Sequence, residues 1–178
     1  MRRVVVTGLG TINPLGNSVE SSWSSLINSE SGIKKIDTFD TELYPCKIAA
    51  TVDNALIDEN IVSSRDLRKI DRFIALGLIA ADEAIKDSGF ISDENSSLSS
   101  GVMVGSGIGG LDTIYRNSSV LDNHGIRKIS PFFIPSALIN LLSGHISIRY
   151  NLKGPNSSPV TACATGTHAI GDSFTLIK

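Results

Sequence analysis

The chain has 178 residues, of which 41% are hydrophobic and 19% are charged. This length suits a single domain, and this composition supplies a substantial core and argues against intrinsic disorder. The formal net charge of −2 argues against nucleic-acid binding through overall charge. No apolar run reaches the roughly 18 residues of a membrane span, so we expect a cytoplasmic protein without membrane segments.

The chain has two cysteines, Cys46 and Cys163, which lie far apart in the sequence. Such spacing predicts neither a disulfide framework nor a zinc site, and we expect no bound metal. In a reducing cytoplasm both thiols remain free, and a thiolate is then available for chemistry.

In the first half of the chain, the β-branched residues 3–7 predict a buried strand that runs into a glycine turn. Asn17 or Ser18 caps a helix, and residues 47–52 favour a short strand. Apolar residues at helical spacing predict a long helix over residues 64–88, with a capping box at its start and Gly89 at its end.

In the second half, residues 92–100 are polar and favour a surface loop, and residues 101–104 favour a buried strand. The glycine-rich residues 105–110 then lead into a helix. A further apolar helix is expected over residues 136–148, with Pro135 at its first position. Residues 157–162 favour a last strand. Strands that alternate with helices indicate an α/β protein with a largely parallel sheet.

Cys163 lies where this last strand gives way to a helix. A thiol at a helix N-terminus faces unpaired N–H groups and the positive end of the helix dipole, which favour the reactive thiolate. The same N–H groups can stabilise an oxyanion on an attacked thioester. Small flanking residues leave room beside the sulfur. Periodicity alone favours the alternative that Cys163 is a small buried hydrophobe.

The motif around this cysteine, Thr161-Ala162-Cys163-Ala164-Thr165-Gly166, resembles the nucleophile motif of the β-ketoacyl-[acyl-carrier-protein] synthases. Other segments match that family in order and spacing: residues 2–10, 13–16, Trp23, 39–40, 68–73, 105–110, 129–135 and 144–145. The resemblance covers essentially the whole chain and is strongest to synthase II, which elongates longer acyl chains.

The resemblance implies a thiolase-like fold, with residues 1–178 as a single N-terminal domain, a layered mixed sheet with helices. It implies a homodimer that takes substrates from the phosphopantetheine arm of acyl carrier protein and needs no cofactor of its own. The acyl group moves to Cys163. Malonyl carrier protein then loses carbon dioxide, and the resulting carbanion attacks the acyl-enzyme to give a 3-oxoacyl carrier protein.

In the family, two histidines and a lysine from a C-terminal half assist decarboxylation. The three histidines here, His124, His145 and His168, do not occupy those positions, and the resemblance places the end of this chain inside the helix that follows Cys163. We therefore expect the chain alone to be inactive in condensation and to need a missing C-terminal half. The alternative is a non-catalytic remnant or interaction subunit. His145 is expected to be a hydrogen-bonded structural residue, and helical spacing predicts that His168 turns away from the sulfur.

Residues 105–110 also fit the dinucleotide-binding fingerprint, but residues 124–128 lack the acidic residue which that fingerprint requires. The glycines are better explained as a tight turn beside the active site. By the resemblance, Ile108 and Phe133 are candidates to line the acyl pocket, with ordinary core positions as the alternative. Basic residues are candidates to dock the acidic carrier protein, unless they only solvate a surface: Arg65, Arg68, Lys69, Arg127 and Lys128.

Overall fold

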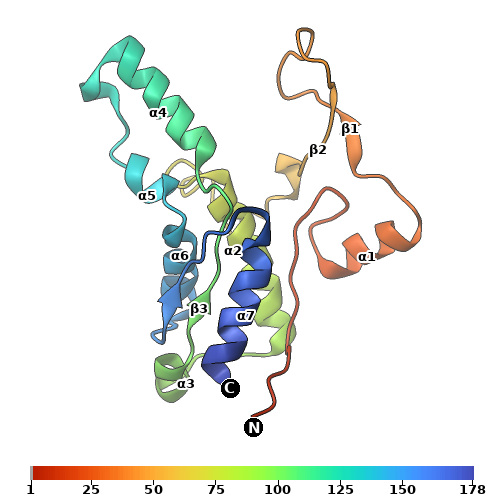
Figure 1. Ribbon diagram of the computed structural model, residues 1–178, viewed down its shortest axis with the longest axis vertical. Coiled ribbons are helices and arrows are strands. Elements are labelled where there is room, and N and C mark those ends of the chain that lie inside the picture. Colours follow the sequence, from red (N-terminus) through yellow and green to blue (C-terminus); the bar gives the residue numbers. More distant parts are fainter. Residues whose placement is uncertain (1) are drawn as a thin grey trace.

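The computed structural model describes residues 2–178 (Figure 1). Two helices that lie side by side, α2 (Arg72–Ser88) and α6 (Asn140–Tyr150), carry most of the core. Ile74 and Leu78 of α2 pack in one buried cluster with Leu142 and Ile146 of α6. Fully burying an aliphatic side chain contributes about 1.5–3 kcal/mol, so the packing of these two helices stabilises the fold.

A short parallel pair of strands, β3 (Val102–Met103) and β4 (Asn156–Ser157), lies between α6 and the last helix, α7 (Thr165–Ile177). Strand β3 contacts both helices, which gives a helix–sheet–helix layering (Figure 1). Strands β1 (Ile33–Lys35) and β2 (Ile48–Ala50) form a separate antiparallel pair. The described strands therefore form two separate two-stranded sheets, one antiparallel and one parallel, rather than the one largely parallel sheet expected from the sequence.

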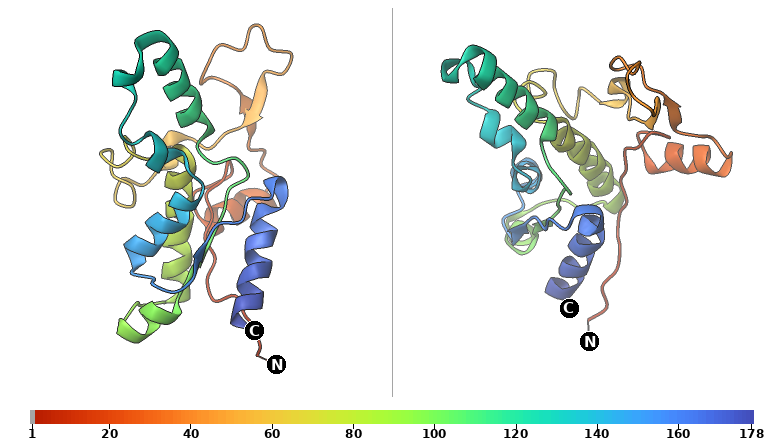
Figure 2. Two further views of the ribbon diagram at one scale, coloured as in Figure 1. Left: turned by 60° about the vertical axis from the view of Figure 1, so that its left-hand side comes forward. Right: turned by 45° about the horizontal axis from the view of Figure 1, so that its top comes forward.

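The remaining helices lie to either side of this body. Helix α1 (Val19–Ile27) adjoins the β1–β2 pair, and α4 (Leu111–His124) and α5 (Phe133–Ala137) extend in the other direction (Figures 1 and 2). Short 3-10 turns complete the chain: η1 (Asn54–Leu56), η2 (Ile126–Lys128) and η3 (Ala162–Ala164). Ser18 caps α1 as predicted.

No helix within residues 2–178 is long and apolar enough to cross a membrane.

The long helix predicted over residues 64–88 begins later, at Arg72. Ser63 and Asp66 do exchange hydrogen bonds, but they close a turn rather than a helix. Asp71 is the true N-cap, because its backbone is extended and its carboxylate accepts from the N–H of Phe73. The same carboxylate accepts from the N–H of Thr113 at 3.0 Å, so one residue starts α2 and anchors α4. Gly89 ends α2 in the left-handed conformation, as predicted.

Residues 3–7 do not form the predicted buried strand. Val5 and Val6 are 64% and 77% exposed, and no strand pairs with them among residues 2–178. The β-branched composition favours an extended chain, but a strand needs a hydrogen-bonding neighbour. The segment leads instead into N–H contacts with α2, where Leu9 and Thr11 donate to Asp87 and Glu83.

Three other predictions about elements were wrong in part. Residues 92–100 contain a short helix, α3 (Glu94–Ser99), which Asp93 caps through a capping box with Ser96. The helix predicted over residues 136–148 is broken at Leu138, whose backbone is extended, so Pro135 lies inside α5. Strand β4 ends at Ser157, because the chain then turns toward Cys163.

Candidate active site: the cysteine turn before α7

Cys163 lies in the 3-10 turn η3, immediately before α7, and its side chain is exposed. The sequence prediction of a cysteine at the start of a helix is thus confirmed to within two residues, and the alternative of a buried cysteine is wrong for this structure. Within residues 2–178, no side chain caps the N-terminus of α7. The N–H of Thr165, the first residue of α7, donates to the carbonyl of Ala162, so an anion near the sulfur would meet the later N–H groups of the first turn.

Ala162, the residue before the cysteine, has a left-handed backbone with φ of 49°. A residue with a Cβ pays of order 1–2 kcal/mol for that conformation, so the surrounding structure must hold it in place. Thr165 does so from inside the protein, since it is only 4% exposed. Its hydroxyl donates to the carbonyl of Ala162 at 2.8 Å and accepts from the N–H of Thr161 at 2.9 Å. We call residues 161–165 the cysteine turn.

The glycine-rich residues 105–110 pack directly against the cysteine turn. A Cβ on Gly105 would lie 2.0 Å from the carbonyl oxygen of Pro159, and one on Gly107 would lie 3.1 Å from that of Ala162. Only glycine allows the two backbones to approach this closely at residue 105. The predicted position of these glycines beside the cysteine is therefore confirmed, and the segment bends there without a hydrogen-bonded β-turn.

His168 does not bond the sulfur but holds the cysteine turn from its exposed side. Its Nδ1 lies 3.2 Å from the hydroxyl of Thr161, and its Nε2 lies 3.2 Å from a carboxylate oxygen of Asp172 on the next turn of α7. Sequence reasoning missed this chain of contacts. Helical spacing placed His168 relative to the sulfur but gave no sign that Thr161 folds back onto α7.

The two residues predicted for the acyl pocket occupy neighbouring segments. Ile108 is 66% exposed and follows Gly107, which touches the cysteine turn. Phe133 begins α5, whose last residue, Ala137, accepts a hydrogen bond of 3.0 Å from the N–H of Gly110. The glycine loop thus connects both segments to the cysteine, and the pocket role of each side chain stays a prediction.

The predicted docking residues fall into two groups. Arg65, Arg68 and Lys69 lie in the turns before α2, and the ammonium of Lys69 lies over the ring of Phe132, 5.7 Å from its centroid. Arg127 and Lys128 lie in η2, beyond the far end of α4 (Figure 1). The structure thus brings Lys69 to the start of α5 but does not join all five residues in one cluster.

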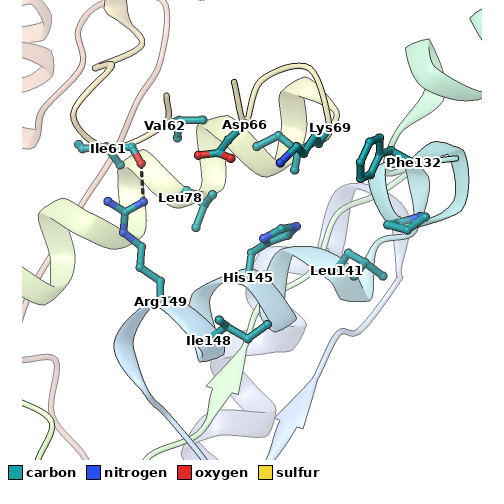
Figure 3. Close-up of a pocket in the computed structure, with 12 residues that line it drawn as sticks. Ile61, Val62, Asp66, Lys69, Leu78, Phe132, Leu141, His145, Ile148 and Arg149 are labelled. Carbon is teal, nitrogen blue, oxygen red and sulfur yellow. Dashed lines mark hydrogen bonds between the residues drawn. The ribbon is translucent and has the colours of Figure 1, made fainter. Parts of the chain in front are cut away.

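A cavity of about 530 Å³ lies away from the cysteine, between α6 and the turns before α2 (Figure 3). We call it the α6 cavity. Leu78 lies at its base, and His145 of α6 points into it, facing the segment that carries Asp66 and Lys69. Burial lowers the pKa of His145, and the nearby Asp66 carboxylate opposes this only in part. No group within residues 2–178 hydrogen-bonds this ring, so the prediction of a hydrogen-bonded structural histidine was wrong.

The described residues, from Arg2 onward, contain no group of three or more His, Cys, Asp or Glu side chains that could hold a metal ion.

The family model described as "Beta-ketoacyl synthase, N-terminal domain" matches residues 1–178. The chain belongs to the beta-ketoacyl synthase family. The family resemblance inferred from the sequence motifs is therefore confirmed over the whole chain.

Its curated relatives include two enzymes named 3-oxoacyl-[acyl-carrier-protein] synthase 2. The protein from Coxiella burnetii is 47% identical over 179 residues, which cover 99% of this chain and 42% of the relative. The protein from Rhizobium meliloti is 45% identical over 185 residues, which cover 99% of this chain and 44% of the relative. The chain therefore spans less than half the length of the relatives it matches.

Solved ketosynthases share its fold. A beta-ketoacyl synthase from Burkholderia phymatum has a TM-score of 0.80 at 23% identity, over 99% of this chain and 44% of the other. The ishigamide ketosynthase/chain length factor has a TM-score of 0.84 at 24% identity, with the same coverage. A third match, at 26% identity and a TM-score of 0.71, belongs to a type II polyketide acyl-carrier protein in complex with its ketosynthase, and covers 99% of this chain and 47% of that one. The predicted thiolase-like fold is confirmed.

Proposed function

We propose that the protein containing this chain is a 3-oxoacyl-[acyl-carrier-protein] synthase of fatty-acid elongation, with Cys163 as its acyl acceptor. The observation that supports this most directly is the position of the thiol. Cys163 is exposed, follows a residue in a strained conformation, and precedes a helix whose first-turn N–H groups have no side-chain cap. A thiolate in this position has both access to a thioester and donors nearby for the oxyanion.

The first half-reaction uses groups of this chain. The Cys163 thiolate attacks the thioester carbonyl of an acyl carrier protein, and the oxyanion forms near the N-terminus of α7. Collapse of this intermediate expels the phosphopantetheine thiolate, which takes a proton. The products are an acyl-Cys163 thioester and free carrier protein, so no redox change or cofactor is needed. Ile108 and Phe133 are proposed to lie along the acyl chain.

The second half-reaction joins two acyl units. Malonyl carrier protein loses carbon dioxide, and the electron pair left on its α-carbon attacks the acyl-Cys163 carbonyl. Cys163 leaves as thiolate, and the product is a 3-oxoacyl carrier protein. The family resemblance assigns decarboxylation to histidine and lysine residues in a part of the relatives that this chain does not span. We therefore propose that the 178-residue chain alone performs acyl transfer but not condensation.

The partners follow from the same reasoning. Acyl carrier protein is the proposed donor, since a similar ketosynthase is known in complex with one. Arg65, Arg68 and Lys69, with Arg127 and Lys128, are proposed to attract its acidic surface. A homodimer, a cytoplasmic location and assembly with a C-terminal half complete the proposal. We propose no metal and no cofactor beyond the phosphopantetheine arm.

A labelling experiment tests acyl transfer. The purified chain is incubated with an acyl carrier protein thioester, and intact-mass and peptide spectrometry locate the added acyl group. The matched variants Cys163→Ala and Cys46→Ala serve as controls, because Cys46 is the other free and exposed thiol. We expect acylation in the wild type and in Cys46→Ala only. Equal acylation of both cysteines, or none, would favour the non-catalytic remnant.

A further inference from the structure

We propose that the α6 cavity binds a small amphipathic monocarboxylate, with the alkyl chain inside the cavity and the carboxylate at its mouth. The site lies outside the reaction derived above, because Cys163 and the other residues of the cysteine turn are absent from its lining. Its volume of about 530 Å³ is in the range of ordinary small-molecule sites.

The interior of the cavity suits an alkyl chain. Val62 and Leu78 are 1% and 6% exposed, belong to the core, and form its inner wall. Leu141 and Ile148, on the α6 side, extend the apolar lining outward (Figure 3). Ile148 is 81% exposed. An alkyl chain in the cavity removes this apolar surface from water.

The charges at the cavity favour one negative group. Lys69 and Arg149 line it together with a single acid, Asp66. Neither cation forms a salt bridge within the described part of the chain: Lys69 lies over the ring of Phe132, and Arg149 donates to the backbone carbonyl of Ile61. The charged side chains that line the cavity, two cations and one carboxylate, carry a net charge of +1, which a monoanion neutralises.

His145 completes the polar side of the site. Burial lowers the pKa of His145, which favours the neutral ring, and this ring points into the cavity and carries one N–H donor. A neutral N–H donor can bind a carboxylate oxygen without adding positive charge to the site. The carboxylate of Asp66 disfavours a dianion such as a phosphate monoester, and the two cations disfavour a cationic amphiphile. The combination therefore selects a fatty-acid-like ligand.

Three matched probes test the charge requirement. Isothermal titration calorimetry on the purified chain compares decanoate, decanol and decyltrimethylammonium, which share an alkyl chain and differ in head group. We expect decanoate to bind about two- to fivefold more tightly than decanol, as one exposed ion pair provides, and the cation to bind most weakly. Equal affinity for the three probes would show a nonspecific apolar surface and overturn the proposal.

Variants then place the ligand in this cavity. Ile148→Asp adds a carboxylate at the mouth on a side chain that is already exposed, so the fold tolerates it and decanoate binding should be lost. Arg149→Gln should lower decanoate affinity about two- to fivefold without changing decanol affinity. Lys153→Gln, an exposed control that does not line the cavity, and Cys163→Ala should leave decanoate affinity unchanged. Unchanged decanoate affinity in Ile148→Asp would refute the site.

Discussion

The buried hydroxyl of Thr165 donates a hydrogen bond of 2.8 Å to the carbonyl of Ala162, the left-handed residue that precedes the exposed Cys163. The first residue of α7 thus fixes the backbone that presents the nucleophile. The hydroxyl has a second contact, from the N–H of Thr161. Its removal leaves that N–H without a partner and leaves the carbonyl of Ala162 with only the backbone N–H of Thr165. A strained turn that loses such support relaxes.

We predict that Thr165→Val slows alkylation of Cys163 by iodoacetamide about tenfold and lowers the free energy of unfolding by about 1–3 kcal/mol, the cost of leaving a polar group unpaired. Thr165→Ser keeps the hydroxyl and should restore most of both losses. The rate is measured by peptide mass spectrometry relative to Cys46, which is exposed in the same chain and corrects for reagent concentration. An unchanged Cys163-to-Cys46 ratio in Thr165→Val would show that the turn does not depend on Thr165.

His168 supports the same turn through a different atom. With Asp172 accepting from Nε2–H, its Nδ1 accepts from the hydroxyl of Thr161. Asparagine places an oxygen near the position of Nδ1, and glutamine places one near Nε2. We predict that His168→Asn retains the wild-type alkylation rate of Cys163, whereas His168→Gln and His168→Ala lower it about two- to fivefold. If all three variants behaved alike in this assay at matched melting temperature, His168 would have no positioning role.

The packing of the glycine loop gives a further test. Gly105→Ala would force a Cβ to within 2.0 Å of the Pro159 carbonyl oxygen, so the loop and the cysteine turn must separate. We predict a loss of about 2 kcal/mol or more in unfolding free energy, typical of overpacking, together with altered reactivity of Cys163. The control is Gly171→Ala in α7, where a Cβ meets nothing within 4 Å. Alanine there should stabilise the helix by about 0.5–1 kcal/mol, and chemical denaturation distinguishes the two.

Local signals in the sequence predicted the parts of the fold that depend on a few neighbouring residues. Ser18 and Gly89 mark helix ends through their own backbone and side chain, and the small residues around Cys163 indicate the start of α7. The predicted start of the long helix was wrong because Ser63 is a plausible cap in the sequence, whereas the structure uses Asp71 as the cap. The choice between the two caps depends on Thr113, which is distant in the sequence and donates the second hydrogen bond to Asp71.

Non-local features could not be read from the sequence. A strand at residues 3–7 depends on a hydrogen-bonding partner, which composition does not reveal. The contact between Thr161 and His168 depends on the left-handed backbone of Ala162. An alanine in the sequence gives no indication of this conformation. The α6 cavity is assembled from α2, α6, the turns before α2 and the start of α5, so no single segment carries its pattern.

A partly buried polar pair links the two core helices and makes stability depend on pH. The hydroxyl of Tyr150 on α6 donates a 2.8 Å hydrogen bond to Asp82 on α2, which also pairs with Lys86. Burial acts to raise the pKa of Asp82, but the hydrogen bonds from Lys86 and Tyr150 outweigh it and hold that pKa below the usual 3.8. Burial, followed by the contact with Asp82, raises the pKa of Tyr150 from 10.0 to about 12.

These shifts predict losses of stability at both ends of the pH scale. Below pH 3.8 the unfolded chain protonates Asp82 before the folded chain does, so this stabilisation disappears as pH falls. Between pH 10.0 and about 12 the unfolded chain ionises Tyr150 first, so its contribution disappears as pH rises. Tyr150→Phe should cost about 1–3 kcal/mol at pH 7 and make unfolding, followed by urea titration, less sensitive to alkaline pH. A wild-type alkaline slope in Tyr150→Phe would contradict this account.

The turns before α2 are proposed to dock the carrier protein. Arg68 is exposed and does not line the α6 cavity, so Arg68→Glu changes the proposed docking surface without changing that site. Because charges at an interface rim act mainly on the association rate, we expect this variant, in the full-length protein, to associate with acyl carrier protein about tenfold more slowly at low salt, and the difference to shrink as salt screens it. Lys153→Glu introduces the same charge change outside the proposed surface and should leave the rate within about twofold of wild type, given how little isolated exposed charges contribute. Stopped-flow measurements over a salt series decide the matter, since an unaltered rate in Arg68→Glu would remove these turns from the docking surface.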